Sequence, residues 1–418
     1  MTPAVDPIPG ASADLHLVHA RVRRVRVPLT PGYVGSMYAM DAAVRTVVEL
    51  VTVDGIVGIG EAPGAIEVFQ LVHRLTRVML GQNLRERRQL QQRFARTTFD
   101  NHNGRHGSAA YAAIETAAWD AVAQSYGLPL RVLLGGVNEA VPIDTVCVIH
   151  PAGISLAISR TASRMHVARS QNVGYPTRYA AMQAEGRGFR RFKYEGTGVN
   201  AAWDIAAMHA LRSSLGDGAR LQFDARGAYT PMDAIALCRG LEPVGVDFVV
   251  DPTEDLEGLA SVRAQSTLPL ATSMSVTQPE HLAPFARQPT ADIILADVGT
   301  WGGVLQYVSL LRTAEVMGIE VGIHSTVEMG IGTVLHLHIA AAFPQIRLAM
   351  ETTLHALEQP LVVGANLEVR DGYMRPPAGP GLGVHLDEAA MSRYTIDEVS
   401  ASYGTSAGHS HTAPMTAS

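Results

Sequence analysis

From residue 142 onward the chain repeats one pattern, in which a short apolar segment precedes a segment with helical periodicity, at intervals of roughly 25 residues. Eight apolar segments occur in this order: PIDTVCVI, FRRFKY, ARLQFDA, VDFVV, LPLA, DIILA, IEVGIH and IRLAME. Short apolar runs that alternate with helices are typical of parallel strands buried on both faces. The pattern therefore predicts an α/β fold, a (β/α)8 barrel.

Two consecutive segments end in polar residues, Asp297 after DIILA and His324 after IEVGI. The carboxyl-terminal ends of barrel strands form one rim, and active sites are built there. Strand ends one βα unit apart are neighbours, so we expect Asp297 to contact the imidazole of His324 and to orient it as a general base. A lone histidine often does no more than end a strand, but several other strands here also end in polar residues.

The segment before the barrel has the pattern of a small antiparallel sheet. Residues 15–29 and 47–60 alternate apolar and polar side chains, and Asp54-Gly55 is a hairpin signal. The irregular stretch TPGYVGSMYAMD carries Tyr33 and Tyr38, which either cover a pocket or lie on a surface turn. Residues 108–127 have helical spacing that ends at Gly127.

These patterns divide the chain into five parts. We expect a flexible tail over 1–14, an α+β capping domain over 15–137 and a barrel over 138–358. Residues 359–398 are rich in Gly and Pro and are predicted to return to the capping domain, and a second tail follows over 399–418.

Composition excludes several classes of function. A formal net charge of -6 without Lys/Arg runs argues against nucleic-acid binding, and no apolar run is long enough to cross a bilayer. Cys147 and Cys238 lie in apolar segments and do not suggest a disulfide framework or a zinc site. The start MTPAVDPIPGAS lacks the features of a signal peptide, so a cytoplasmic protein that acts on small molecules is expected.

Several motifs together resemble the enolase superfamily, and most closely its glucarate dehydratase-related branch. They run through most of the chain and are GIGEAPG, AIETAAWDAVAQSYGLPLRVLLGG, FKYEG, FDARGAY, LPLATSMS, LADVGTW, IHS and PGLGV. The resemblance implies an α+β capping domain over a modified (β/α)8 barrel and a tendency to form homo-oligomers. It also implies removal of a proton α to a carboxylate by a Lys or His base, with Mg²⁺ stabilising the ene-diolate.

Compared with that branch, the metal positions of this chain are altered. The Lys-x-Lys of the second strand is Lys193-Tyr194-Glu195 here, and the metal-ligand Asp of the third strand is kept as Asp224. The fourth-strand ligand is replaced by Val250, and Ser273 stands where the branch has Asn. Mg²⁺ prefers several hard oxygen ligands, so no cofactor is favoured, and Mg²⁺ is the weaker alternative.

The resemblance also assigns the other rim residues. Asp297 and His324 match the Asp/His dyad of the family, and Glu351 falls at the acidic position of the eighth strand. Arg226 follows Asp224 by two residues, so both side chains point to the barrel mouth if the strand stays extended. Arg226 then either binds a substrate carboxylate together with Lys193 or fills the vacated metal position by pairing with Asp224.

The sequence thus predicts a lyase of the dehydratase type, or an isomerase, acting on a small hydroxy or sugar acid. Four residues are assigned to catalysis: His324, Asp297, Lys193 and Glu195. Five are assigned to substrate binding: Arg226, Glu351, Ser273, Tyr33 and Tyr38. One alternative is a non-catalytic protein that binds an acidic ligand, and another is a metal enzyme with a site rebuilt from Asp224, Glu195 and Asp251.

Overall fold

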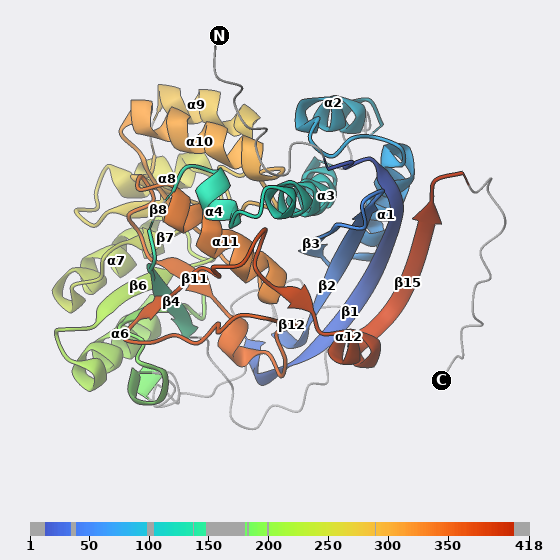
Figure 1. Ribbon diagram of the computed structural model, residues 1–418. Helices are drawn as coiled ribbons and strands as arrows, with labels where there is room; N and C mark the ends of the chain where they lie inside the picture. The colour runs from blue at the N-terminus through green and yellow to red at the C-terminus, as the bar shows by residue number, and fades with distance from the viewer. Residues whose placement is uncertain are drawn as a thin grey trace, which may run out of the picture.

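The computed structural model describes residues 13–34, 39–97, 104–136, 138–147, 180–181, 184–198, 200–288 and 290–404 of the chain. Figure 1 shows two parts that pack side by side, an antiparallel sheet with its own helices and a curled parallel sheet surrounded by helices. The fold is a modified (β/α)8 barrel with an α+β capping domain. The predicted fold class is therefore confirmed.

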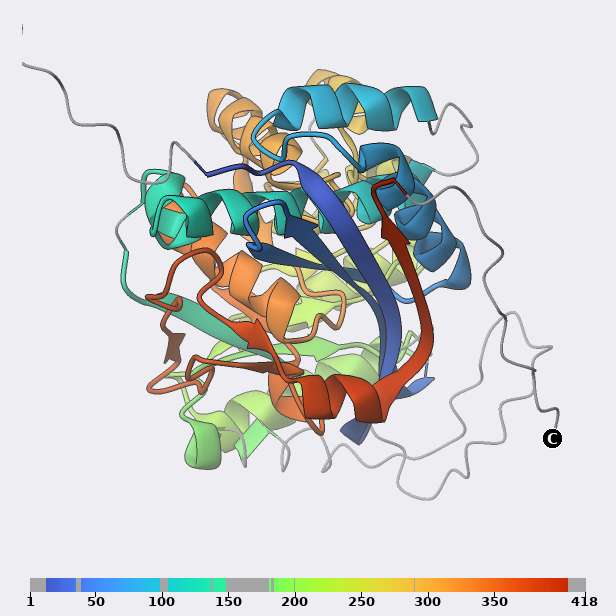
Figure 2. The same cartoon turned by 45° about the vertical axis from the view of Figure 1, so that its right-hand side comes forward.

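The capping sheet has four antiparallel strands in the order β15-β1-β2-β3. They are β1 (Leu17–Val34), β2 (Ala39–Thr52), β3 (Val57–Pro63) and β15 (Thr395–Ser402). The predicted hairpin joins β2 to β3, and Gly55 takes the left-handed conformation that this turn needs (φ 75°). Strand β15 lies along β1, as Figure 2 shows, so the end of the described chain returns to its beginning.

Three helices belong to this part of the chain: α1 (Ile66–Met79), α2 (Arg87–Thr97) and α3 (Gly104–Ser125). Helix α3 lies very close to β3 because small residues face each other. A Cβ atom placed on Gly60 would lie 1.9 Å from the carbonyl oxygen of Ala113. Gly60 is therefore required by the close approach of two backbones.

The parallel strands follow the order β10-β9-β8-β7-β6-β5-β4-β11. Their bounds are β4 (Val141–Cys147), β5 (Arg191–Glu195), β6 (Arg220–Asp224), β7 (Val249–Val250), β8 (Leu270–Thr272), β9 (Ile293–Ala296), β10 (Glu320–Ile323) and β11 (Met350–Thr352). Each overlaps one of the eight predicted apolar segments. The outermost strands approach each other where the side chain of Leu348, just before β11, packs against Gly322 of β10.

Helices surround this sheet on its outer side (Figure 1). Their bounds are α4 (Leu130–Leu133), α6 (Ala201–Leu215), α7 (Pro231–Leu241), α8 (Leu256–Arg263), α9 (Leu282–Arg287), α10 (Val304–Met317) and α11 (Gly330–Ala342). Helix α12 (Glu388–Tyr394) lies beside β1 of the capping sheet. Local sequence explains several starts, since Asn200, Thr230 and Asp255 each cap the first turn with a side-chain oxygen. Short strand pairs β12 (Val362–Val363) with β14 (His385–Leu386), and β13 (Tyr373–Met374) with β4, complete the fold.

Some expectations from the sequence need correction. Strand β15 continues to Ser402, past residue 398 where a tail was predicted to begin, because its backbone pairs with β1. Tyr38 and the side chain of Tyr33 lie outside the described residues, so their predicted role stays untested. No helix in the described ranges is long and apolar enough to cross a membrane.

The contact between β3 and α3 predicts a large cost for a small substitution. Gly60→Ala should lower the free energy of unfolding by about 1–3 kcal/mol, because the new methyl group overlaps the backbone of α3. Urea unfolding would measure this loss. Gly218→Ala is the matched control, since nothing lies within 4 Å of its Cβ position. Equal stability of the two variants would show that the close approach is wrong.

Candidate active site

The polar residues predicted at the strand ends gather at the carboxyl-terminal mouth of the barrel. Lys193 and Glu195 come from β5, Asp224 from β6 and Glu351 from β11, and His324 directly follows β10. All five are buried, with at most 7% of their surface exposed. Charged groups held away from water in this way interact strongly with one another.

Glu351 connects the two basic groups of the site. Its Oε1 lies 2.7 Å from Nζ of Lys193, and its Oε2 lies 2.8 Å from Nδ1 of His324. The backbone N–H of Ser325 also donates to Oε2, at 3.2 Å. Burial by itself would raise the pKa of Glu351, but Lys193 and His324 hold that pKa well below its usual range. Glu351 is therefore an ionised carboxylate that can only accept hydrogen bonds.

This arrangement determines which nitrogen of His324 is available. Because Glu351 is ionised, the bond between them requires a proton on Nδ1. In neutral His324 the basic atom is then Nε2. A carboxylate that orients an imidazole in this way is the arrangement in which histidine acts as a general base.

The expected contact between Asp297 and His324 is not made; the two residues form neither a hydrogen bond nor an ion pair in the described part of the chain. Asp297 instead accepts hydrogen bonds from the N–H groups of Gly299 and Thr300, at 2.9 and 3.1 Å. Its Oδ1 also lies 3.6 Å from Nε2 of His336 on α11. The predicted partner of His324 is therefore wrong. The end of β11 also adjoins β10, and Glu351 of β11 is the carboxylate that contacts His324.

Lys193 lies between two carboxylates of the site. Its ammonium lies 3.3 Å from Oδ2 of Asp224 in addition to its contact with Glu351. Burial alone would lower the pKa of Lys193, but Glu351, Asp224 and Glu195 raise it above the usual range. Oδ2 of Asp224 is buried without a hydrogen bond among the described residues, so this ammonium is the positive charge that faces it.

Arg226 reaches the site differently from the prediction. Strand β6 ends at Asp224, and Arg226 has a left-handed backbone conformation (φ 54°) rather than an extended one. Its backbone N–H donates to Oδ1 of Asp224 at 3.0 Å, while its side chain lies 3.8 Å from Oε1 of Glu195. The side chain of Arg226 remains 21% exposed, so it borders the barrel mouth.

The end of β7 is bent, and this bend orients Asp251. Asp251 has φ 39°, and its carboxylate accepts hydrogen bonds from Oγ1 of Thr272 and from the N–H and Oγ of Ser273, at 2.7 to 2.8 Å. Burial and the nearby Asp224 raise the pKa of Asp251. Val250, at the expected ligand position, is buried and offers no ligand atom. Ser273 therefore binds Asp251 in this structure.

Within the described ranges, one group of side chains has the composition and spacing of a metal site, and the sequence reasoning missed it. It consists of Asp297, Glu328 and His336, whose ligand atoms lie within 4.8 Å of one another. Burial alone would lower the pKa of His336, but Asp297, Glu328 and Glu61 raise it. The sequence feature that could have indicated this group is His336, a histidine in the apolar helical segment that follows the IHS motif.

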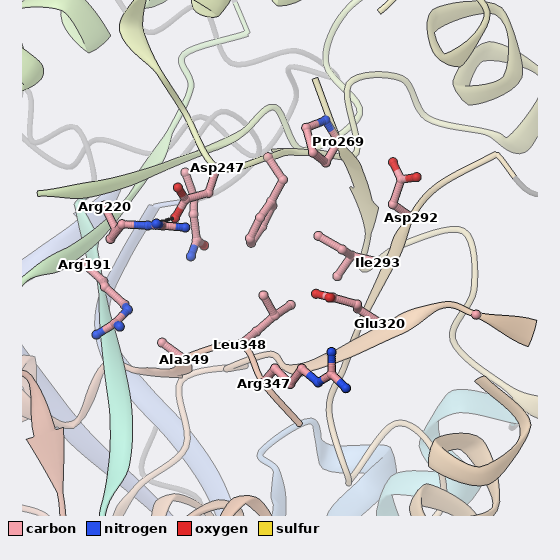
Figure 3. Close-up of a pocket in the computed structure, with 13 residues that line it drawn as sticks. Arg191, Arg220, Asp247, Pro269, Asp292, Ile293, Glu320, Arg347, Leu348 and Ala349 are labelled. Carbon is pink, nitrogen blue, oxygen red and sulfur yellow. Dashed lines mark hydrogen bonds and ion pairs between the residues drawn. The ribbon is translucent and has the colours of Figure 1, made fainter. Parts of the chain in front are cut away.

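A cavity of about 590 Å³ opens at the opposite end of the barrel. Figure 3 shows Arg191, Arg220 and Glu320 there, each the first residue of its strand, together with Arg347. Arg220 is paired with Asp247 at 2.8 Å. Since catalytic groups of barrels gather at the carboxyl-terminal ends of the strands, we place the candidate site at the other mouth.

Comparison with known families agrees with this geometry. Residues 17–135 match the mandelate racemase / muconate lactonizing enzyme N-terminal domain, and residues 177–390 match the enolase C-terminal domain-like family. The chain belongs to the enolase superfamily. Its predicted resemblance is thus confirmed over both parts of the fold.

Curated members of the superfamily are similar to this chain along most of their length. A probable glucarate dehydratase of Streptomyces coelicolor is 25% identical over 83% of this chain and 84% of its own. Muconate cycloisomerase 1 of Rhodococcus opacus is 26% identical (91% and 99%), and the L-Ala-D/L-Glu epimerase of Bacillus subtilis is 25% identical (88% and 97%).

Solved structures of the superfamily give the same result. An enolase of Streptomyces coelicolor, described as a putative sugar isomerase without Mg, is 29% identical with a TM-score of 0.79, over 91% of this chain and 96% of that one. An enolase of Thermobispora bispora complexed with magnesium and formate is 28% identical with a TM-score of 0.82, over 91% and 92%. Magnesium-bound and magnesium-free relatives therefore share this fold.

Asp144 of β4 is a buried carboxyl group of the barrel interior, in register with Glu351. Gln222 donates to its Oδ2 at 2.7 Å, whereas its Oδ1 has no hydrogen bond among the described residues. Burial raises the pKa of Asp144 to about 7. Asp144 makes no ion pair with a described residue, so its ionisation is costly in the folded protein.

This environment predicts a pH-dependent stability difference. Ionising Asp144 is less favourable in the folded protein than in the unfolded chain, where an Asp has a pKa of about 3.9, so the wild type loses stability as pH rises from about 4 to about 7. Asp144→Asn removes this loss. Its stability relative to wild type should increase over that range by on the order of a few kcal/mol and then stay constant.

Urea unfolding at pH 5 and pH 8 would measure the change. Asp217→Asn, at an exposed turn, is the control and should show no such trend. A difference between Asp144→Asn and wild type that does not vary with pH would contradict the assignment.

Proposed function

We propose that this member of the enolase superfamily is a lyase or isomerase in which His324 removes the proton α to a carboxylate. The substrate class is a small hydroxy or sugar acid, and elimination of water or isomerisation follows. The main support is the bond between Glu351 and Nδ1 of His324, which leaves Nε2 as the basic atom. The dehydratase, cycloisomerase and epimerase names of its relatives agree with this general chemistry.

The positive charge needed by the substrate would come from the chain itself. Arg226 borders the barrel mouth and can bind a carboxylate through two parallel hydrogen bonds. Lys193 is almost fully buried and already bonded to Glu351, so its role would be to hold Glu351 and to place a positive charge near the reacting carbon. Glu195, beside Arg226, would orient the guanidinium or exchange protons with the substrate.

The family's Mg²⁺ does not fit its usual position here. Val250 offers no ligand, and Asp251 and Ser273 are bonded to each other. The carboxylate of Asp224 already faces the ammonium of Lys193 at 3.3 Å. A dication placed there would compete with the ammonium of Lys193 for the carboxylate of Asp224, which is a poor environment for an ion that is costly to dehydrate.

Variants of His324 and of its partner Glu351 test the proposed base. His324→Asn should abolish turnover, and Glu351→Gln should lower it by roughly 10²–10⁴-fold, because the imidazole loses its orienting partner. Washout of the α-proton in D2O, followed by NMR over a panel of hydroxy and sugar acids, would measure both. Arg370→Ala, at an exposed ion pair, is the control. Wild-type exchange in His324→Asn would rule out this base.

A second test concerns the carboxylate anchor. Arg226→Ala should weaken the binding of an acidic ligand at least about tenfold, and Arg226→Lys should not restore it fully, because an ammonium cannot form the paired hydrogen bonds. Calorimetric titration with the best acid of the panel would measure the affinities. Addition of Mg²⁺ should not change them. If Mg²⁺ strengthens binding and Arg226→Ala has no effect, Asp224, Glu195 and Asp251 hold a rebuilt metal site instead.

A further inference from the structure

A second group of ionisable side chains lies between the barrel and the capping sheet, and the proposed reaction does not use it. We call Asp297, Glu328 and His336 the His336 cluster. Asp297 follows β9, Glu328 lies between β10 and α11, and His336 is on α11. Each is at least 94% buried. These residues come from a different part of the barrel than Asp224, Val250 and Ser273, where the family binds its metal.

The imidazole of His336 faces this cluster. Its Nε2 lies 3.6 Å from Oδ1 of Asp297. With bonds of about 2.0–2.2 Å, two ligands of a tetrahedral Zn²⁺ ion lie about 3.4 Å apart. The observed separation therefore suits two ligands of one ion.

The buried carboxylates around His336 also favour the binding of a cation. Asp297, Glu328 and Glu61 all act on the imidazole, and all three are buried. Arg45 also acts on Asp297, and its Nε is bonded to Glu61 at 2.7 Å. Three buried carboxylates therefore lie around the imidazole of His336. Buried charge without a counter-charge is strongly unfavourable.

We propose that Asp297, Glu328 and His336 bind one divalent transition-metal ion of the Zn²⁺ class. One nitrogen and two carboxylate ligands match the preference of Zn²⁺, whereas Mg²⁺ takes oxygen ligands. A dication bound by Asp297 and Glu328 would match the two negative charges of their carboxylates. Three protein ligands also leave the fourth tetrahedral position open.

The neighbours of the cluster already hold it in place. Ser325 donates to Oε2 of Glu328 at 2.6 Å, and the N–H of Thr326 donates to Oε1 at 2.5 Å. Glu61 of β3 accepts from the N–H groups of Met329 and Gly332 at 2.8 Å each, so the capping sheet is tied to the start of α11. Such secondary contacts orient metal ligands. Binding of the ion should therefore stabilise the contact between the capping sheet and the barrel.

Metal binding can be measured without a substrate. The full chain, with His409 and His411 replaced by Ala to remove loose binding near its end, is titrated with Co²⁺ and then with Zn²⁺. We expect one equivalent of Co²⁺ with the visible absorption of a tetrahedral nitrogen and oxygen site, its displacement by Zn²⁺, and a higher Tm with metal. His336→Ala and Glu328→Gln should each lower the affinity on the order of 100-fold.

The controls separate this site from others. His209→Ala, on the exposed surface of α6, should bind metal like its parent. Circular dichroism checks that each variant is folded. If His336→Ala does not fold, the metal affinity of Glu328→Gln tests the proposal. No uptake of Co²⁺ or Zn²⁺ by the parent, or equal uptake by both cluster variants, would overturn the proposal and leave His336 as a buried imidazolium. Loss of activity in His324→Asn tests the base separately and does not bear on this site.

Discussion

The carboxylate of Glu351 is the interaction on which the candidate site depends. It is buried between the ammonium of Lys193 and the imidazole of His324, and each of its oxygens has a basic partner. Without Glu351, Lys193 would lose its contact at 2.7 Å, and Nδ1 of His324 would lose its partner. Removing one member of such a buried network leaves an uncompensated charge. The arrangement of each of these three residues therefore depends on the other two.

Under the proposed function, the same network would supply the positive charge that the substrate needs. Family members place a cation where negative charge develops, and in this chain Lys193 and Arg226 bring fixed positive charges to that region. The carboxylate of Asp251 is held by Ser273 at the neighbouring strand end, and the Val250 side chain offers no ligand atom.

Charge also links the two parts of the fold. Arg45 and Glu61 of the capping sheet reach the loop before α11, where Arg45 donates to the carbonyl of Thr326 at 3.1 Å. Asp297 and His336 lie next to this contact on the barrel side. The capping sheet therefore contributes to the electrostatics of the barrel mouth as well as covering it, and substitutions in the sheet are expected to act on both.

Much of the fold followed from local pattern. The eight apolar segments predicted the parallel strands, because strands buried on both faces need apolar residues. The Asp54-Gly55 pair predicted the hairpin, because a tight turn needs such residues. The residues at the strand ends were also predicted correctly, since the register of a strand decides which side chain is last. The sequence therefore indicated that Lys193, Asp224, His324 and Glu351 lie at or near the carboxyl-terminal ends of their strands.

Which of these residues pair with each other was decided by the tertiary structure. His324 has a carboxylate on a strand end at either side, and the packing of β10 against β9 and β11 selected Glu351. Arg226 and Asp251 adopt left-handed backbone conformations, which the alternation of apolar and polar residues along a strand does not predict. These conformations set the direction of their side chains. His336 reached Asp297 only because α11 packs beside the end of β9. Such contacts depend on distances of a few ångströms between segments far apart in sequence, and a linear pattern does not contain them.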